Sequence, residues 1–566
     1  MAKKLIECVP NFSEGRDLAV IKQITDVIEA VEGVKLLDVD PGEATNRTVV
    51  TFVGEPEPVM EAAFLAVRKA SELIDMSKHH GAHPRMGATD VCPLVPVANI
   101  TLEECAELAR TLGKRIGDEL GIPVYAYEAA AFTPERRNLA ICRKGEYEAL
   151  SKRFGEEGEK PDFGPSVWNE FTSRSGATAV GARDFLIAVN YNLNSTSTRR
   201  ANAIAFDVRE KGRPQREGGK PNGKPMKDEN GEVIMLPGTL KGTKAIGWYI
   251  DEYGIAQVSM NITNIRETPL HVAFDEVCRC AANRGLRVTG TEIVGLIPKS
   301  TLIDAGKHFL RKQQRSVGIH ESEIIKIAVK SMGLDDLKPF DPSEKVIEYM
   351  LEDNNKKRLI DLTCKGFAEE TASESPAPGG GSISAYMGSL AAALGTMVGN
   401  LSSHKPGWDD RWEFFSNWAE KGQELMAHLL HLVDEDTEAF NKIMAVFSMP
   451  KSTDEEKAAR SKAMQEATLY ATQVPLETMK ASFATFPLVK MMAEEGNPNS
   501  VSDAGVGALA ARAAVLGAHL NVKINASGLK DRAVADALVA EADKIAAEAC
   551  KQEAEILEIV NQKING

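Results

Sequence analysis

The sequence predicts an α+β N-terminal half made of two ferredoxin-like βαββαβ subdomains, followed by an all-α helical-bundle domain. Strand-like and helix-like segments alternate over roughly the first 300 residues, and the same element order occurs there twice. From Leu359 onward the chain is rich in alanine and almost wholly helical in pattern. At 566 residues the chain also exceeds what one hydrophobic core supports.

Six segments build the first βαββαβ unit, because apolar residues alternate in the short segments and recur at helical spacing in the long ones. Strands are predicted over residues 4–9, 34–40, 47–53 and 91–97, and helices over 17–31 and 56–74. A further helix over 102–120 and a strand over 123–127 follow. The expected fold is an antiparallel sheet with helices on one face.

The same order returns in the second unit. Strands are predicted over residues 185–192, 245–250, 256–262 and 287–294, and helices over 197–209 and 269–284. The boundary between the two units is placed near residues 176–183. The Gly/Pro/Lys-rich segment 211–244 is expected to be an exposed hairpin or loop.

The C-terminal part carries helical patterns near residues 361–371, 382–403, 410–447, 454–495, 500–520 and 530–562, with breaks expected within some of them. Residues 452–456 offer a capping-box helix start. The predicted domains are therefore an N-subdomain over 1–181, a C-subdomain over 182–337, a linker over 338–358 and a helical domain over 359–566.

Composition narrows the function classes. The net charge of −14 argues against nucleic acid as the main partner. The most apolar stretch, 383–401, is rich in Gly, Ala and Ser, so a buried helix is expected there and not a membrane span. The N-terminal apolar run is too short for a signal peptide. Eight scattered cysteines without a CxxC pair suit free thiols in a reducing cytoplasm.

Three histidines, His79, His80 and His83, fall in a stretch broken by glycine and proline, which predicts a loop. Proton transfer, metal binding and no role at all are open interpretations. An acid–base histidine is favoured, because histidine titrates near neutrality and no thiolate or carboxylate set accompanies the loop for a metal.

Three motifs stand out in the helical part. Residues 379–382 are either an anion-binding helix start, capped by Ser382, or a flexible linker. The acidic run 434–438 favours a solvated helix face by its residues alone. Ser502 or Asp503 is expected to cap the following helix. Residues 218–225 imitate a phosphate loop, but proline replaces the hydroxyl residue and ATP binding is rejected.

Taken together, the motifs resemble the formimidoyltransferase–cyclodeaminase family. Residues 7–15, 37–40, 45–48, 83–87 and 161–165 are similar to its transferase half, and residues 377–382, 432–436 and 502–503 to its cyclodeaminase half. The resemblance covers nearly the whole chain in the family's domain order. Segment 211–240 is longer than in the family's animal members.

The resemblance implies two reactions of histidine degradation. The first transfers the formimino group of N-formimino-L-glutamate to tetrahydrofolate. The second closes 5-formimino-tetrahydrofolate to 5,10-methenyl-tetrahydrofolate and releases ammonia. No metal and no tightly bound cofactor is implied, and tetrahydrofolate, as a polyglutamate, is a cosubstrate. The resemblance further implies a cytoplasmic homo-oligomer, an octamer in the family.

Site residues carry over by position. The catalytic residues are His83 and Asp436, which reverses the surface interpretation of the acidic run. The folate-binding segment maps to Gly164, Pro165, Ser166, Val167, Trp168, Asn169, Glu170, Phe171, Thr172 and Ser173, although its part from Val167 onward departs from the animal pattern. Gly380, Gly381, Ser382 and Asp503 are expected beside the ligand of the helical domain.

The chemistry of the transferase suggests three more residues. Arg47 and Arg85 are expected to hold substrate carboxylates, because arginine binds these bidentately. Asp40 is expected to orient His83 or to hold the pterin. Two alternatives remain open: a methenyl-tetrahydrofolate cyclohydrolase in place of the cyclodeaminase, and a non-catalytic folate-binding protein.

Overall fold

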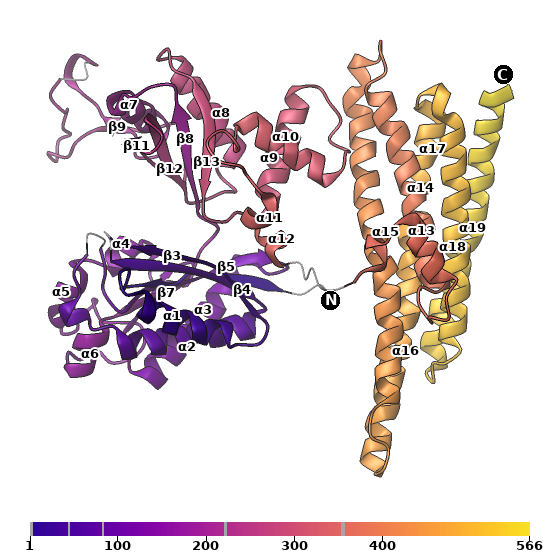
Figure 1. Ribbon diagram of the computed structural model, residues 1–566, viewed down its shortest axis with the longest axis horizontal. Helices are drawn as coiled ribbons and strands as arrows, with labels where there is room; N and C mark the ends of the chain where they lie inside the picture. Colours follow the sequence, from indigo (N-terminus) through magenta and orange to yellow (C-terminus); the bar gives the residue numbers. More distant parts are fainter. Residues whose placement is uncertain (1–3, 44–45, 82–83, 220–222, 352–356, 566) are drawn as a thin grey trace. The chain divides into compact units, whose positions relative to one another are not determined.

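The computed structural model describes residues 4–43, 46–81, 84–219, 223–351 and 357–565. The chain forms two compact units (Figure 1). The first unit holds Met1–Thr301 with Met332–Glu352, and the second holds Leu302–Ser331 with Asp353–Gly566. The domain limits expected from the sequence stay a prediction, and these units divide the chain differently, since residues 302–331 join the helical part.

The first sheet has the predicted ferredoxin-like arrangement. Antiparallel strands follow the order β3, β4, β1 with β2, and β5. Helices α1, α2 and α3 cover one face of this sheet, as Figure 1 shows, and their apolar sides form its core. The bounds are β1 Leu5–Cys8, β2 Asn11–Phe12, β3 Val34–Gly42, β4 Arg47–Gly54, β5 Thr89–Ala98, α1 Leu18–Glu29, α2 Pro56–Leu73 and α3 Leu102–Leu120.

Two parallel strands extend this sheet beyond the ferredoxin pattern. β7 (Thr178–Ala182) pairs with β5, and β6 (Val124–Glu128) pairs with β7. β7 lies where the sequence suggested a boundary. All five of its residues are buried. A central strand of small residues that is buried on both faces has no apolar–polar alternation, so the sequence pattern did not predict it. Gly181 is required there, since a side chain would lie 2.5 Å from the carbonyl oxygen of Tyr127.

Short helices complete the first subdomain between β6 and β7. They are η2 Glu135–Arg137, α4 Leu139–Cys142, α5 Glu146–Arg153 and α6 Glu170–Ser175, together with η1 Met76–Lys78 earlier in the chain. None of them was predicted, because each is too short to show a periodic pattern.

The second sheet is also ferredoxin-like, with strand order β11, β12, β8, β13 and all pairs antiparallel. Its elements are β8 Ile187–Leu193, α7 Thr198–Val208, β11 Thr243–Ile250, β12 Ile255–Ile262, α8 Leu270–Ala282 and β13 Val288–Val294. The predicted insertion holds a small hairpin of β9 (Arg213–Pro214) and β10 (Met235–Leu236), with η3 (Glu217–Gly219) between them. Helices α11 (Pro342–Lys345) and α12 (Ile347–Leu351) close the unit.

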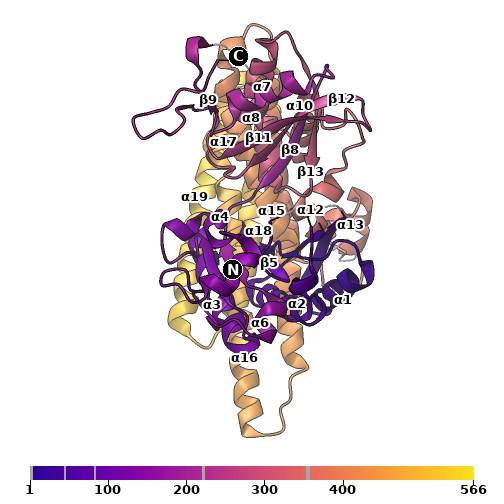
Figure 2. The same cartoon turned by 90° about the vertical axis from the view of Figure 1, so that its left-hand side faces the viewer.

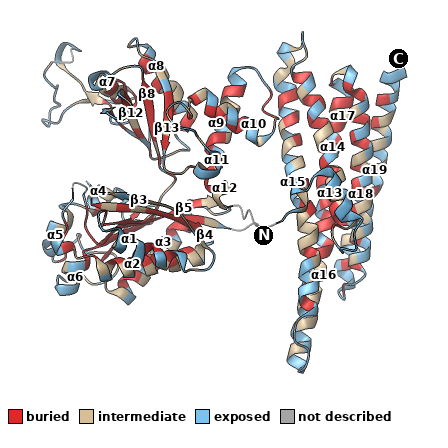
Figure 3. Ribbon diagram, in the orientation of Figure 1, coloured by how far each residue is buried: buried red, intermediate tan, exposed pale blue. Residues whose placement is uncertain are grey.

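The second unit is a helical bundle around α14, whose buried residues recur along its whole length (Figure 3). Figure 2 shows the α15–α16 turn projecting past the other helices of this unit. The helices are α9 Lys299–Lys312, α10 Glu321–Met332, α13 Cys364–Thr371, α14 Gly380–Ser403, α15 Trp412–Phe447, α16 Asp454–Phe483, α17 Phe486–Glu495, α18 Val501–Ala526 and α19 Arg532–Asn565, with short turns η4 Leu359–Asp361, η5 Asp409–Arg411 and η6 Pro498–Ser500.

Contacts explain why residues 302–331 belong to this bundle. The backbone N–H of Val317 donates to Ser416 Oγ at 3.0 Å, and Asn400 Nδ2 donates to the Gly318 carbonyl oxygen at 2.7 Å. The sequence pattern gave no sign of this packing, because long-range contacts leave no local period.

Two helices are long and apolar enough to cross a membrane by length and composition, Gly380–Ser403 and the stretch Pro498–Ala526. In the folded unit, 61% and 50% of their most apolar windows are buried. The buried-helix interpretation of residues 383–401 therefore describes how α14 packs in this structure.

The segment predicted as one helix over 454–495 is two helices. α16 ends at Phe483 and α17 begins at Phe486, with Pro487 in its first turn. Proline has no N–H to donate and its ring clashes with the preceding turn, so the chain breaks there. The capping box at the start of α16 is confirmed, between Thr453 and Glu456.

A second proline, Pro475, lies inside α16 without ending it. Proline at this position leaves the carbonyl of Ala471, four residues earlier, without its helical donor. Asn525 of α18 supplies a replacement, since its Nδ2 donates to that carbonyl oxygen at 2.6 Å. A long-range side-chain bond thus repairs the helix.

This repair predicts a stability coupling. Asn525→Ala should lower the free energy of unfolding of the helical unit by about 1–2 kcal/mol, because a buried carbonyl loses its donor. In a Pro475→Ala background the restored backbone N–H can fill the gap, so the same change should cost clearly less. Urea unfolding followed by circular dichroism at 222 nm measures both; equal costs in the two backgrounds would contradict the coupling.

Candidate active sites

The histidine loop of the first unit is anchored by His79. Its ring is 7% exposed, its Nε2 lies 2.9 Å from the Asn46 carbonyl oxygen, and its Nδ1 accepts from Arg85 Nε at 3.4 Å. Nε2 therefore carries the proton in this arrangement. Burial is the main cause that lowers the pKa of His79. These contacts give His79 a structural role, whereas His83 lies outside the described residues.

Asn46 organises the start of this loop. Its backbone has a φ of 47°, a left-handed conformation that asparagine tolerates better than most residues. Its side chain accepts from the Gly15 N–H at 3.0 Å and donates to the His80 carbonyl oxygen at 3.1 Å. The strand turn after Phe12 and the histidine loop are thus tied to one side chain.

Arg85 is buried and already paired with the protein's own carboxylates. Its Nη2 and Nη1 donate to the two oxygens of Glu148 at 2.7 and 2.9 Å, and Nη1 also donates to Glu146 at 3.3 Å. These pairs raise the pKa of Arg85, with the Glu148 hydrogen bond as the largest cause. In this structure the Arg85 guanidinium joins α5 to the segment that carries His79. The donors expected to bind a substrate carboxylate are therefore bonded to Glu146 and Glu148.

A second charged group lies on the same sheet. The carboxylate of Asp90, fully buried, accepts from the Met86 N–H at 3.0 Å and pairs with Arg143, whose Nε lies at 3.2 Å. Burial lowers the pKa of Arg47, while the charges of Asp90 and Asp40 counteract this effect. Asp40 and Asp90 therefore both act electrostatically on Arg47, while the substrate roles expected for Arg47 and Asp40 stay predictions.

Between these groups lies a cleft of about 740 Å³. Both subdomains contribute, because Lys244 comes from β11 and the other lining residues come from the first subdomain. The polar groups that line it are His80, Arg85, Asn138, Arg143, Lys144, Glu146, Glu148 and Lys244. Its cationic side chains suit a substrate that carries carboxylates.

The predicted folate segment forms an exposed aromatic surface beside Tyr147. Trp168 packs on Tyr147 at 5.7 Å and on Phe154 at 6.1 Å between ring centroids, while Val167 and Phe171 are 58% and 43% exposed. Arg85 lies 5.9 Å from the centroid of the Tyr147 ring. This surface therefore neighbours the Arg85 network and can receive a flat ring.

The backbone of this segment is fixed locally. Asn169 and Thr172 form a capping box at the start of α6, and Tyr147 Oη donates to the Ser173 carbonyl oxygen at 2.6 Å. Ser166 Oγ donates to the Phe154 carbonyl oxygen at 2.7 Å. Gly164 has a φ of 77° and lies against the Ile122 carbonyl, where a side chain would clash. Pro165 and Glu170 complete the predicted set.

In the helical unit, Asp436 meets the first turn of α14. Its Oδ2 accepts from the Ser382 backbone N–H at 2.8 Å and from Ser382 Oγ at 3.1 Å. Burial raises the pKa of Asp436, and the two Ser382 hydrogen bonds partly oppose the rise. A side chain at Gly381 would lie 2.1 Å from the carboxylate, so glycine is required there.

Two predictions about this region are wrong. Ser382 does not cap α14, because Gly379 is the N-cap and Ser382 turns to Asp436 and to the Val433 carbonyl instead. The acidic run is not a solvated face. Asp434 Oδ1 accepts from the Leu359 N–H at 2.6 Å, and Glu435 bonds to Tyr470 Oη. The η4 turn before α13 therefore covers part of the run.

Asp503 is not brought to Asp436. It lies in the first turn of α18, whereas Asn521, eighteen residues further along, is the α18 residue next to Gly380. At 1.5 Å per residue the two positions are about 27 Å apart. Ser502 and Asp503 do not cap the helix either, since its N-cap is Ser500 and the preceding turn is capped by Asn497.

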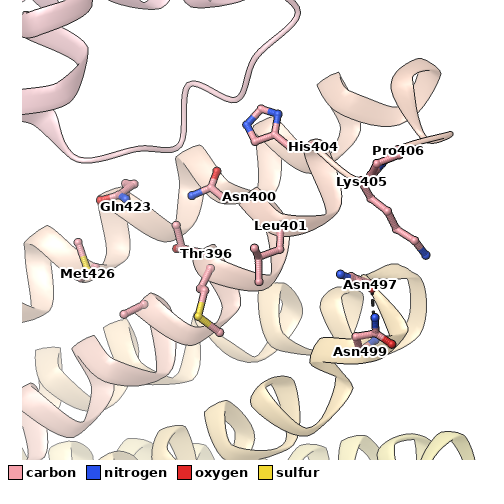
Figure 4. A pocket seen from close by; sticks show the side chains of 12 residues that line it. Thr396, Asn400, Leu401, His404, Lys405, Pro406, Gln423, Met426, Asn497 and Asn499 are labelled. Atoms are coloured by element: carbon pink, nitrogen blue, oxygen red, sulfur yellow. Dashed lines mark hydrogen bonds between the residues drawn. The ribbon is translucent and has the colours of Figure 1, made fainter.

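The helical unit has a cavity of about 800 Å³ near the start of α18 (Figure 4). Its polar lining is Thr396, Asn400, His404, Lys405, Gln423, Asn497 and Asn499. Of the α14 residues that line this cavity, Ala393 is the one nearest to Ser382 in the sequence. The two are eleven positions apart, or about 16 Å along the helix, so the cavity is separate from the Asp436 region. Burial lowers the pKa of His404, with Arg315 as the second cause.

Comparison with known proteins covers both units. Residues 5–183 match the formiminotransferase domain, N-terminal subdomain, residues 188–352 match the formiminotransferase domain, and residues 363–544 match the formiminotransferase-cyclodeaminase family. A formimidoyltransferase-cyclodeaminase of Gallus gallus is 43% identical over 529 residues, which is 93% of each chain. The chain belongs to the formimidoyltransferase–cyclodeaminase family.

Relatives of the two separate halves agree with this membership. A glutamate formimidoyltransferase of Thermoplasma acidophilum is 43% identical over 54% of this chain and 92% of its own. A methenyltetrahydrofolate cyclohydrolase of Methylorubrum extorquens is 40% identical over 36% of this chain and 98% of its own. The protein is thus an enzyme of the formimidoyltransferase–cyclodeaminase family, and each of its halves is similar to a separate enzyme.

Several site residues left no signal in the sequence. Glu148, Asp90 and Arg143 lie far apart in the chain and are joined only by the fold. Asn46 belongs to a motif that the resemblance used, but its left-handed backbone and its three contacts are visible only in the structure.

The buried His79 predicts a pH dependence. Its folded pKa lies below its unfolded value of about 6.5, so the unfolded chain takes up the proton first. The stabilising contribution is complete above about pH 6.5 and is lost as the pH falls toward the folded pKa. His79→Gln keeps a donor and an acceptor but cannot titrate. The urea midpoint of the first unit should therefore fall less in this variant than in the wild type as the pH is lowered below about 6.5.

The exposed His80, changed to Gln, is the matched control and should keep the fall. An identical pH profile of His79→Gln and the wild type would exclude His79 as its source.

Proposed function

We propose that His83 and Asp436 are the acid–base residues of the two reactions of this bifunctional folate enzyme. In the first, the formimino group of N-formimino-L-glutamate moves to N5 of tetrahydrofolate. In the second, 5-formimino-tetrahydrofolate closes to 5,10-methenyl-tetrahydrofolate and ammonia leaves. The observation that carries the proposal is the carboxylate of Asp436, which lies against the first turn of α14 and accepts two hydrogen bonds from Ser382. It belongs to the half of the chain whose reaction releases ammonia.

The transfer needs one proton moved in each direction. N5 attacks the formimino carbon and forms a tetrahedral intermediate, then N5 loses a proton and the glutamate nitrogen gains one as its bond to carbon breaks. A single group that titrates near neutrality can do both, which typically contributes about 10²–10⁴-fold. His83 has that role in the proposal, and it follows His79 by four residues in the sequence, where the described contacts of His79 and Asn46 fix the preceding residues.

The cyclodeamination needs an acid. N10 attacks the formimino carbon, and the nitrogen of the resulting aminal leaves as ammonia only after protonation. A carboxyl whose pKa is raised by burial keeps its proton to a higher pH and can donate it, and the raised pKa of Asp436 supports this role. The Gly380–Ser382 turn then lies beside the ligand, because Ser382 itself holds the carboxylate. Asp503 lies about 27 Å along α18 from the residue next to Gly380 and has no role in this proposal.

The cleft of the first unit supports the binding roles. Its cations Arg143, Lys144 and Lys244 suit the carboxylates of both substrates, and the 164–173 segment offers a surface for the pterin or benzoyl ring. Arg47 and Asp40 stay candidates for pterin or substrate contacts. Tetrahydrofolate serves as cosubstrate, and the two reactions themselves need no tightly bound cofactor.

We further propose that the enzyme acts in histidine degradation, in the cytoplasm, as a homo-oligomer. The eight cysteines, all free thiols, support a reducing compartment. Exposed apolar residues on two neighbouring helices, Leu390 and Met397 of α14 with Leu509 and Leu520 of α18, support association with further copies. An octamer is the form implied by the family resemblance.

A cyclohydrolase second half is the remaining alternative. The match to a methenyltetrahydrofolate cyclohydrolase over the helical unit is the observation that favours it. Ammonia release separates the two, because a cyclohydrolase alone forms none. Retention of both His83 and the buried Asp436 argues against a non-catalytic folate-binding protein.

Separate variants test the two assignments. His83→Ala should abolish transfer of the formimino group while added 5-formimino-tetrahydrofolate is still deaminated. Asp436→Asn should abolish ammonia release while transfer continues. Methenyl-tetrahydrofolate absorbance and free ammonia, followed together, report both steps. Loss of both activities in either variant, with folding intact by circular dichroism, would contradict two independent sites.

The contacts of Asp436 predict a pH shift. Protonated Asp436 is the active form, so ammonia release should fall as the pH rises through its folded pKa. Ser382 Oγ stabilises the ionised form, and Ser382→Ala should raise this pKa further and move the alkaline limb upward by about one pH unit.

Ser384→Ala is the matched control for this shift, since Ser384 Oγ bonds to the Gly380 carbonyl and not to Asp436. An alkaline limb that Ser382→Ala leaves in place would rule out Asp436 as the titrating acid.

A further inference from the structure

The helical unit has a basic pocket that has no role in the two proposed acid–base steps. It lies beside the α15–α16 turn, has a volume of about 450 Å³, and is lined by the cations Lys451, Lys457, Arg460 and Lys530. No carboxylate belongs to its lining, all of which falls within the described residues, in a chain whose net charge is −14. Its composition suits an anionic ligand.

Three segments hold this pocket together. Arg460 donates from Nε to the Val446 carbonyl oxygen at 3.1 Å and from Nη2 to the Phe447 carbonyl oxygen at 3.3 Å. Lys530 Nζ donates to Ser461 Oγ at 2.7 Å, and its backbone N–H donates to Gln465 at 2.6 Å. The end of α15, the first half of α16 and the loop after α18 are thereby fixed to one another.

Two acids near the pocket are already engaged, one with a pocket lysine and one with backbone N–H groups. Asp454 pairs with Lys457 at 2.9 Å and therefore neutralises part of one cation. Glu456 accepts from the backbone N–H groups of Ser452 and Thr453 as part of the capping box. Lys451, Arg460 and Lys530 have no carboxylate partner among the interactions of the described residues.

Apolar residues follow Asp436 along α15 toward the end of the helix, where Arg460 of the pocket bonds to the Val446 carbonyl. Phe440, Ile443 and Phe447 follow Asp436 at spacings of four, seven and eleven residues, so all four lie on one face of α15. Phe447 is 57% exposed, and the Arg460 guanidinium lies 5.9 Å from the centroid of its ring. From Asp436 to Val446 the helix rises about 15 Å.

This order of groups matches the order of groups in a folate. An acid stands where N10 and the formimino carbon react, aromatic and aliphatic side chains follow, and cations stand at the end. A para-aminobenzoylglutamate chain reaches roughly 12 Å from N10 to its carboxylates at ordinary bond lengths, and a flexible lysine side chain covers the remainder.

We propose that the basic pocket of Lys451, Arg460 and Lys530 binds the glutamate carboxylates of the folate whose formimino group reacts at Asp436. The proposal rests on the proposed cyclodeaminase function and adds the site that fixes the orientation of its substrate. The benzoyl ring lies along the apolar residues of α15 that end at Phe447.

The test is steady-state kinetics of the full-length enzyme with 5-formimino-tetrahydrofolate, measured by ammonia release. Lys451→Gln/Lys530→Gln should raise KM about tenfold and leave kcat within about twofold, because remote charged contacts stabilise ground and transition states alike. Lys451→Arg/Lys530→Arg, which keeps the charge, should restore KM. Lys462→Gln is the matched control, since this exposed α16 lysine lies outside the pocket and pairs with Glu466.

Calorimetric titration with para-aminobenzoyl-L-glutamate tests the pocket independently of catalysis. The Lys451→Gln/Lys530→Gln variant should lose one binding event that the wild type shows, and inorganic phosphate at equal concentration should not replace it. If the wild type released no ammonia, the proposed function would fail while this titration still decided the pocket. Unchanged KM and unchanged titration, or displacement by phosphate alone, would overturn the proposal.

Discussion

The close approach of α14 to the helices around it is the constraint on which the helical unit depends. Side chains at Gly388, Gly395 and Gly381 would lie 2.3 Å from Ser482 Oγ, 2.7 Å from Leu488 Cγ and 2.1 Å from Asp436 Oδ1. Glycine at these positions lets the helices meet without a gap, and close packing rewards that contact. The same approach places a backbone N–H of α14 against the carboxylate, so packing and the proposed chemistry use one arrangement.

Much of the architecture followed from hydrophobic period alone. Both ferredoxin-like units have the predicted order of elements along the chain, since each long strand and helix shows its own clear pattern. β7 was not predicted, because Thr178–Ala182 is short, made of small residues and buried on both faces, and therefore shows no alternation of apolar and polar residues. The break between α16 and α17 lay in a continuous helical pattern in which only Pro487 signalled an end.

The site was less predictable than the fold. The catalytic assignment of Asp436 came from the family resemblance, whereas the acidic run 434–438 by itself favoured a solvated helix face. The sequence does not show that α14 and the η4 turn cover α15 at this point. Arg85 was expected to hold a substrate carboxylate, and its pairing with Glu148 was not predictable because it depends on α5, a helix too short to predict. His83 lies outside the described residues, and its assignment rests on sequence.

The bond from Asn525 to the Ala471 carbonyl also has a consequence for synthesis of the chain. Helix α16 leaves the ribosome with one backbone acceptor that its own residues cannot satisfy, and the residue that satisfies it is made 54 positions later. The Ala471 carbonyl therefore gains this donor only after most of α18 has emerged from the ribosome. In contrast, every strand of the two sheet subdomains precedes α16 in the chain.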